Sequence, residues 1–210
     1  MRYCPCGAFV KTPIETQLDQ LRQNLDLRPD QIDVGALLPI FVPSSFFAKG
    51  NWMGPFSRLR APEIGLTWTV LLPNQTMRYV GPDMQQFWEK QELDWKVLAL
   101  RNLSDRTNGH PGTRQMLKTG GGLASIAFMF EDGLGPSRLL FRGGLAQQFP
   151  QGYRVAMPEM SCGFAFAKDL EGPDLATMMN VIDRCYAKGT RPLSPAVYEP
   201  DDLLPLEAIS

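Results

Sequence analysis

The order of strand-like and helix-like segments along the chain is the sequence feature that most limits its fold. Residues 66–72 and 76–80 are rich in β-branched and apolar residues, and residues 73–75 between them are typical of a turn, so this region predicts a hairpin. A second hairpin is predicted from residues 153–157 and 162–167. Helical patterns lie between and after these hairpins without a strict strand–helix–strand alternation. The sequence therefore predicts an α+β fold, with a mixed or antiparallel sheet built from two hairpins plus additional strands and about five helices packed on it.

The strongest single pattern is an amphipathic helix over residues 173–188. Its apolar side chains recur at the i, i+3, i+4, i+7 spacing of a helix that buries one face, and Lys188-Gly189 is typical of a helix end. The residues predicted to face inward are Leu175, Met178, Met179, Ile182, Cys185 and Tyr186.

The remaining elements have weaker patterns. Helices are predicted over residues 13–25, in a short segment after Pro82, over residues 95–104 behind the capping residue Asp94, and over residues 136–149. Further strands are predicted at residues 37–42 and 123–130. Most of residues 28–62 is expected to be irregular, and residues 105–122 are expected to form a loop.

Length and composition indicate one domain that needs no cofactor to fold. The chain has 210 residues, 44% hydrophobic and 20% charged, and a chain of this length buries roughly 70% of the surface that it exposes when unfolded. Residues 1–11 and 199–210 are expected to be loosely ordered ends. With 21 basic and 22 acidic residues, the chain lacks the positive charge typical of a nucleic-acid-binding protein. No signal peptide or membrane-spanning segment is visible, so we expect a cytoplasmic protein that binds neither nucleic acid nor a membrane.

The four cysteines form no recognisable disulfide or metal pattern. One residue separates Cys4 from Cys6, whereas zinc and redox motifs usually have two residues between their thiols, and no histidine lies nearby. A four-thiolate zinc site would also need Cys162 and Cys185, but Cys185 belongs to the apolar face of its predicted helix. We therefore expect reduced thiols, no bound metal and no cofactor.

Several short segments between residues 37 and 195 stand out together. They are Leu37-Leu38-Pro39-Ile40, Met77-Arg78-Tyr79-Val80, the stretch from Leu93 to Leu103, Pro136-Ser137-Arg138-Leu139-Leu140, Arg154-Val155-Ala156-Met157-Pro158 and Leu193-Ser194-Pro195. In this combination the chain resembles the bacterial YtpQ-like family, a family of unknown function (DUF1444). The resemblance implies an architecture and a bacterial origin, and it implies no activity.

One candidate site combines a polar residue on an inward helix face with a possible anion-binding helix start. Asn102 falls on the same helix face as Trp95, so its amide either ties down a neighbouring loop or strand edge or lines a pocket. Ser137 and Arg138 begin a predicted helix, where the serine is a cap or both residues bind an anion such as phosphate or carboxylate. His110, the only histidine, lies in a turn-rich loop and is either an exposed turn residue or a functional side chain. A pocket built from Asn102, Arg138 and His110 predicts an enzyme or a sensor of a small molecule or anion.

An aromatic-rich segment and an acidic tail favour a different function. Phe46, Phe47, Trp52 and Phe56 lie in the segment expected to be irregular, and residues 199–206 are rich in acidic residues, proline and leucine. The sequence contains no catalytic triad, metal cluster or cofactor-binding motif. The leading prediction is therefore a non-enzymatic protein-binding domain, whose partner is another protein or a second copy of the chain.

Overall fold

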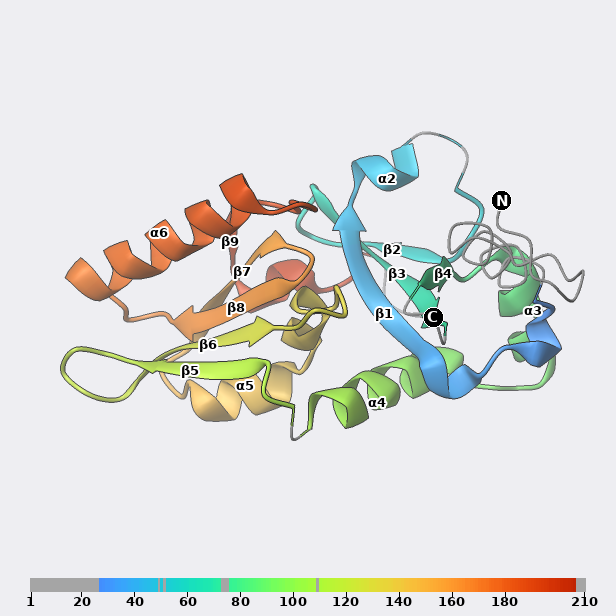
Figure 1. Ribbon diagram of the computed structural model, residues 1–210, viewed down its shortest axis with the longest axis horizontal. Helices are drawn as coiled ribbons and strands as arrows, with labels where there is room; N and C mark the ends of the chain where they lie inside the picture. The colour runs from blue at the N-terminus through green and yellow to red at the C-terminus, as the bar shows by residue number, and fades with distance from the viewer. Residues whose placement is uncertain (1–26, 49, 51, 73–75, 109, 207–210) are drawn as a thin grey trace, which may run out of the picture.

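The computed structural model describes residues 27–206 apart from residues 49, 51, 73–75 and 109. These residues form two antiparallel sheets that lie next to each other, with helices on their faces (Figure 1). The predicted α+β fold is confirmed, although its strands belong to two sheets rather than one. The helix predicted over residues 13–25 and the expected loose end at residues 1–11 lie outside the described residues.

The first sheet is organised around one buried strand, β3 (Ile64–Leu71), in which every residue is buried. It pairs with β1 (Leu37–Pro43) on one side and with β2 (Phe56–Arg58) on the other, and β4 (Met77–Tyr79) pairs with the C-terminal part of β3. All these pairings are antiparallel. The β3–β4 pair is the predicted hairpin, and β1 is the predicted strand at residues 37–42.

Two helices of this half, α3 and α4, begin where the sequence predicts them, whereas three short helices lie in the segment expected to be irregular. Helix α3 (Pro82–Lys90) has a proline in its first turn and buries Met84 and Trp88. Asp94 caps α4 (Trp95–Thr107) by accepting a hydrogen bond at Oδ1 from the Val97 amide, at 3.3 Å. The short helices before β2 are the 3₁₀ helices η1 (Pro29–Gln31) and η2 (Val34–Ala36) and the α-helical turn α2 (Ser45–Ala48).

The second sheet has the strand order β5-β6-β8-β7-β9. Its strands are β5 (Thr113–Leu117), β6 (Leu123–Met129), β7 (Tyr153–Glu159), β8 (Cys162–Ala167) and β9 (Val197–Tyr198). The β7–β8 pair is the second predicted hairpin. The expectation of a loop over residues 105–122 is wrong for residues 105–107, which extend α4, and for residues 113–117, which form the edge strand β5. All five side chains of β5 are exposed, so this strand lacks the alternation of apolar and polar residues that identifies a half-buried strand.

The helices of the second half pack on opposite faces of this sheet (Figure 1). Residues 136–149 form two elements rather than one helix, the 3₁₀ helix η3 (Pro136–Leu140) and α5 (Arg142–Gln148). The long helix α6 (Gly172–Lys188) is confirmed, and Met178 and Ile182 are its buried residues. Tyr186 is a correction, because its side chain is 37% exposed instead of facing the sheet.

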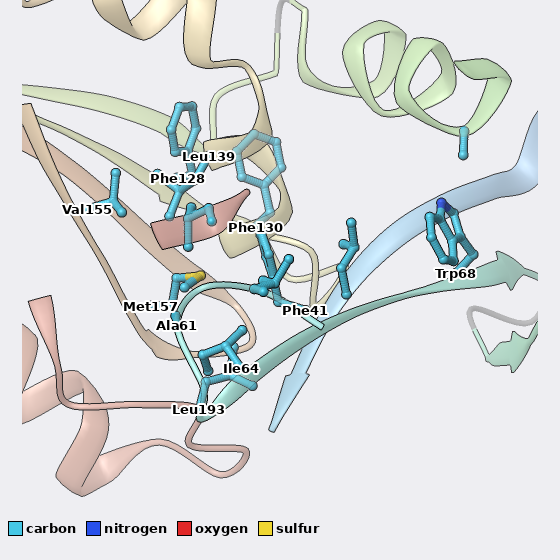
Figure 2. Packing of buried hydrophobic residues seen from close by; sticks show 14 of the residues in the cluster. Phe41, Ala61, Ile64, Trp68, Phe128, Phe130, Leu139, Val155, Met157 and Leu193 are labelled. Carbon is cyan, nitrogen blue, oxygen red and sulfur yellow. The ribbon is translucent and has the colours of Figure 1, made fainter. Parts of the chain in front are cut away.

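One hydrophobic cluster connects the two sheets. Phe41 and Trp68 of the first sheet belong to the same buried cluster as Phe128 and Val155 of the second (Figure 2). Leu139 of η3 adds to this cluster. The apolar faces of both sheets are buried in this cluster. Moving one sheet away from the other would therefore expose these apolar residues to water.

The acidic tail packs against the first sheet as far as residue 206. Its 3₁₀ helix η4 (Pro200–Leu203) buries Leu203, and the Arg60 amide donates a hydrogen bond to the Leu204 carbonyl, at 3.1 Å. The Leu206 amide donates to the Arg58 carbonyl, at 2.8 Å. The expectation of a loosely ordered end is therefore corrected for residues 199–206, because backbone pairing and an apolar anchor hold this segment on the strand edge.

Candidate functional site

The aromatic residues that the sequence singles out come together in the structure. Phe46, Phe47, Trp52 and Phe56 form one cluster with Tyr79 of β4, which we call the aromatic cluster. The rings of Phe47 and Phe56 are stacked with their centroids 4.6 Å apart. The ring centroid of Phe46 lies 5.0 Å from that of Trp52 and 5.1 Å from that of Tyr79. These separations lie in the range in which aromatic pairs attract each other.

Local backbone geometry explains how the aromatic cluster is held against the sheet. The α2 turn follows β1 directly and carries Phe46 and Phe47. Phe47 lies so close to Gly65 of β3 that any side chain at residue 65 would collide with its ring. Burial raises the pKa of the Tyr79 hydroxyl at the other side of the cluster, so this phenol stays neutral at physiological pH.

Part of the aromatic cluster remains exposed to solvent. Phe46 is 36% exposed and Phe56 is 40% exposed, and the adjoining Met53 is 79% exposed. Large apolar side chains that are exposed side by side are uncommon on a monomer unless they bind something. The exposed edge of the cluster is therefore the first candidate for a docking surface.

Two hollows lie along β2, next to the aromatic cluster. One hollow, of about 360 Å³, is bordered by apolar residues that include Phe47, Phe56, Ile64 and Leu206, and by Arg58. The other, of about 410 Å³, is lined by Phe56, Ser57, Arg58 and Pro205. Phe56 and Arg58 are two residues apart on one strand, so they share a strand face and line both hollows.

Arg58 supplies a charge to this apolar surface. Its side chain is exposed, and no ion pair or hydrogen bond of its guanidinium is found among the described residues. We call the aromatic cluster, the two hollows and Arg58 the β2 surface. An arginine beside exposed aromatic rings is the residue combination that is enriched at protein–protein interfaces.

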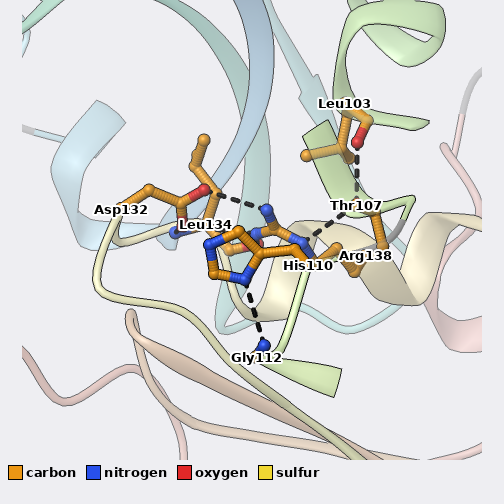
Figure 3. A network of polar contacts seen from close by, with 7 residues as sticks. All are labelled: Leu103, Thr107, His110, Gly112, Asp132, Leu134 and Arg138. Atoms are coloured by element: carbon orange, nitrogen blue, oxygen red, sulfur yellow. Dashed lines mark hydrogen bonds and ion pairs between the residues drawn. The ribbon is translucent and has the colours of Figure 1, made fainter. Parts of the chain in front are cut away.

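Arg138, the centre of the alternative site, is a completely buried structural residue. Its side chain is 0% exposed and forms an ion pair with Asp132, at 2.9 Å (Figure 3). Its Nε donates to Thr107 Oγ1, at 3.0 Å, and its Nη1 donates to the Leu134 carbonyl, at 2.8 Å. The guanidinium also lies over the Phe130 ring, 3.3 Å from the ring centroid. Burial is the main cause that lowers the pKa of Arg138, and the hydrogen bond with Asp132 opposes it.

His110 lies beside this arginine but is not oriented as a catalytic base. Its imidazole stacks on Phe130 with the centroids 4.6 Å apart, and its Nδ1 accepts a hydrogen bond from the Gly112 amide, at 3.0 Å (Figure 3). No carboxylate is bonded to this ring among the described residues, although a general base usually needs such an orienting partner. The contacts of His110 are those of a turn residue that closes its own loop.

Asn102 and Ser137 have no contact with Arg138 through their polar atoms. The Asn102 amide donates to the carbonyl oxygens of Val34, at 2.8 Å, and Leu37, at 3.0 Å, so it ties the start of β1 to α4. This corresponds to the structural alternative for Asn102. Ser137 is 1% exposed, and its hydroxyl has no hydrogen-bond partner in the described part of the chain, so it does not cap η3.

The remaining candidates for chemistry are the four cysteines and the acidic residues that could bind a metal ion. Among the described residues, no three histidine, cysteine, aspartate or glutamate side chains are arranged to hold a metal ion. Cys4 and Cys6 lie outside these residues. Cys162 and Cys185 are free thiols. No described helix has the length and apolar character needed to cross a membrane.

Two residues of the β2 surface were not identified from the sequence. Tyr79 belongs to a return strand that the sequence predicts, but no local pattern places it next to Phe46, which is far away along the chain. Arg58 lies in a segment expected to be irregular, and its role depends on the fold of the tail around Pro205 and Leu206. Long-range contacts therefore complete a surface of which the sequence shows only the four aromatic members. Comparisons of the chain with protein-family models, with curated proteins and with solved structures returned no match.

Proposed function

We propose that this protein binds a partner protein through the β2 surface. The occupant is a short extended segment of the partner that carries an aromatic or aliphatic side chain next to an acidic residue. The observation that carries the proposal is that the aromatic cluster, the two hollows and Arg58, which has no ion pair within the described part of the chain, meet around β2.

The shape and charge of the β2 surface determine what the partner segment must offer. The hollow beside Phe47 and Phe56 accepts one apolar side chain, and burying such a side chain contributes about 1.5–3 kcal/mol. Arg58 lines the same hollow and matches a carboxylate one or two residues away on the partner. The preference for an acidic partner segment rests on this charge.

The tail limits where the partner segment can lie. Backbone hydrogen bonds from residues 202–206 already cover the strand edge at Arg58 and the residues that follow it. The edge at Phe56 and Ser57 borders the second hollow instead. We therefore place the partner segment across Phe56 rather than along the whole of β2.

Selection from a displayed library of random peptides tests this proposal. We expect selected peptides to contain an aromatic or aliphatic residue next to aspartate or glutamate. The double variant Phe46→Ser/Phe56→Ser should bind them at least about tenfold more weakly, because tenfold corresponds to only about 1.4 kcal/mol. The variant Arg58→Gln should remove most of the salt dependence of binding.

The matched control is Met129→Ser, which removes an apolar side chain that is 48% exposed at a distant strand end. This variant should bind the selected peptides as the natural protein does. Equal binding by the double variant would contradict the proposal. Concentration-dependent dimerisation that the double variant abolishes would also contradict it, because the occupant would then be a second copy of this chain.

A further inference from the structure

A third hollow, of about 500 Å³, lies between the β7–β8 hairpin and the C-terminal half of α6. Two cysteines line it, Cys162 at the start of β8 and Cys185 on α6. Cys162 is only 5% exposed, whereas Cys185 is half-buried. Both are free thiols, and both pack in the hydrophobic cluster under α6. The two thiols therefore share one cavity.

The backbone holds these cysteines at the same corner of the fold. Cys162 is the register partner of Glu159 across the β7–β8 hairpin. Gly189, directly after α6, lies so close to the Glu159 side chain and to the Cys185 carbonyl oxygen that a β-carbon at residue 189 would collide with both. The end of α6 therefore packs against Glu159, the register partner of Cys162.

The electrostatics of the hollow distinguish the two thiols. Burial is the main cause that raises the pKa of the Cys162 thiol, and the neighbouring Cys185 thiol and the Glu159 carboxylate raise it further. Cys162 therefore stays protonated and is a poor nucleophile toward a reagent from solvent. Arg184 and Lys188 also line the hollow, together with Glu159, so its charged lining consists of two cations and one carboxylate.

We propose that Cys162 and Cys185 are a modification site at which a small anionic disulfide, of the class of oxidised glutathione, introduces an intramolecular disulfide. The half-buried thiol in the cavity, the buried thiol behind it and the two cations at its rim carry this assignment. The site is independent of the β2 surface, because its residues belong to the second sheet and to α6.

The exchange has two balanced steps. The Cys185 thiolate attacks one sulfur of the small disulfide, the bond between its sulfurs breaks, and one small thiolate leaves with the electron pair. Cys162 then loses its proton to water, its thiolate attacks the Cys185 sulfur, and the second small thiolate leaves with the electron pair and takes up a proton from water. The two protein thiols are oxidised to one disulfide, and the small disulfide is reduced to two thiols.

The new bond would connect the beginning of β8 to the last turns of α6. It closes the chain between residues 162 and 185 and so restricts the unfolded state. We expect the oxidised protein to unfold at a higher urea concentration than the reduced protein. The disulfide would also occupy the Cys185 sulfur, so alkylating reagents that enter the hollow would no longer label this residue.

The test uses the full chain with Cys4→Ser and Cys6→Ser, which leaves only the two cysteines of the site. The folded protein is equilibrated in buffers of increasing ratio of oxidised to reduced glutathione, free thiols are alkylated, and the protein is digested and weighed. We expect a linked peptide that contains Cys162 and Cys185. Two alkylated cysteines in the most oxidising buffer, with the fold retained by circular dichroism, would overturn the proposal.

Single variants test the order of attack. With Cys162→Ala we expect a stable glutathione adduct on Cys185, and with Cys185→Ala we expect no adduct on Cys162. An adduct on Cys162 in the folded Cys185→Ala protein would overturn the assigned order. Lys188→Gln should slow oxidation by oxidised glutathione several-fold, because it removes one positive charge from the hollow. The same variant should leave oxidation by uncharged hydroxyethyl disulfide unchanged. An equal effect on both reagents would overturn the role of charge.

Discussion

At the scale of single residues, the charged and polar groups in the interior hold segments together. Arg138 connects η3, the end of α4 at Thr107 and the turn at Asp132, and it does so from a completely buried position. Asn102 connects α4 to the start of β1. Both residues are the kind that sequence reasoning flags as possible ligand-binding groups, because a buried polar side chain must have partners. Here the partners are parts of the same chain.

Replacing Arg138 should therefore destabilise the fold strongly. The variant Arg138→Met keeps the apolar stem but removes the guanidinium that forms an ion pair with Asp132. The Leu134 carbonyl and Thr107 Oγ1 each lose the hydrogen bond that they accept from this guanidinium. We expect a loss of about 3–5 kcal/mol in the free energy of unfolding, measured by urea denaturation. Arg114→Met on the exposed strand β5 is the control and should change stability by less than about 0.5 kcal/mol. A small loss for Arg138→Met would show that this network does not hold the three segments.

The amide of Asn102 can be tested by a nearly isosteric change. In Asn102→Asp a carboxylate faces the Val34 and Leu37 carbonyl oxygens and can donate to neither, so we expect a loss of at least about 1–3 kcal/mol. Asn102→Ala should lose about as much. Asn180→Asp on the exposed face of α6 is the matched control, and urea denaturation of all three proteins provides the comparison. Equal stabilities of Asn102→Asp and the control would contradict the structural role.

At the scale of elements, the sequence predicts those that carry a strong local pattern of apolar residues, turn residues or helix caps. The β3–β4 and β7–β8 hairpins, α4 behind Asp94 and the long helix α6 were identified because apolar periodicity and capping residues act locally. Strand β5 was missed because both of its faces are exposed, so that its backbone pairing with β6 is what makes it a strand. The tail was predicted to be loosely ordered because its contacts are with residues far away in the sequence.

The tip of the β5–β6 hairpin offers a pH test of one such distant contact. Asp174 at the start of α6 accepts hydrogen bonds from the Thr119 amide, at 3.0 Å, and from the Thr119 hydroxyl, at 2.6 Å. These bonds lower the pKa of the exposed Asp174 carboxyl, and the Lys118 ion pair likewise lowers that of Asp169. Because the folded-state values lie below the unfolded value of about 3.9, the contact is present above that pH and is lost as the pH falls through the lowered values.

We expect the amide proton of Thr119 to shift in NMR spectra with a midpoint below about pH 4, as the Asp174 carboxylate becomes protonated. In Asp174→Asn this titration should disappear, whereas Asp183→Asn on an exposed part of α6 should leave it unchanged. An unaltered titration in Asp174→Asn would contradict the contact between the hairpin tip and α6.

At the scale of the whole molecule, two sheets share one core, and surface hollows lie at two separate places. Two hollows lie along β2 beside the aromatic cluster, and a third lies under α6 on the second sheet. The sequence indicates the four aromatic residues of the β2 surface but does not indicate that they lie together. Their arrangement depends on the pairing of β2 with β3 and on the packing of the tail. The resemblance to the bacterial YtpQ-like family stays a prediction, and the proposed function rests on the β2 surface alone.

The most direct test of the proposed function is to map where a selected peptide binds. Amide signals of the full chain are assigned by NMR and recorded with and without a peptide from the library selection. We predict that the signals that change belong to residues 44–48, to Trp52 and Phe56–Arg58, and to Tyr79. Changes confined to the exposed edge of β5 or to the hollow under α6 would contradict the proposal, because the protein would then bind peptides through a different surface.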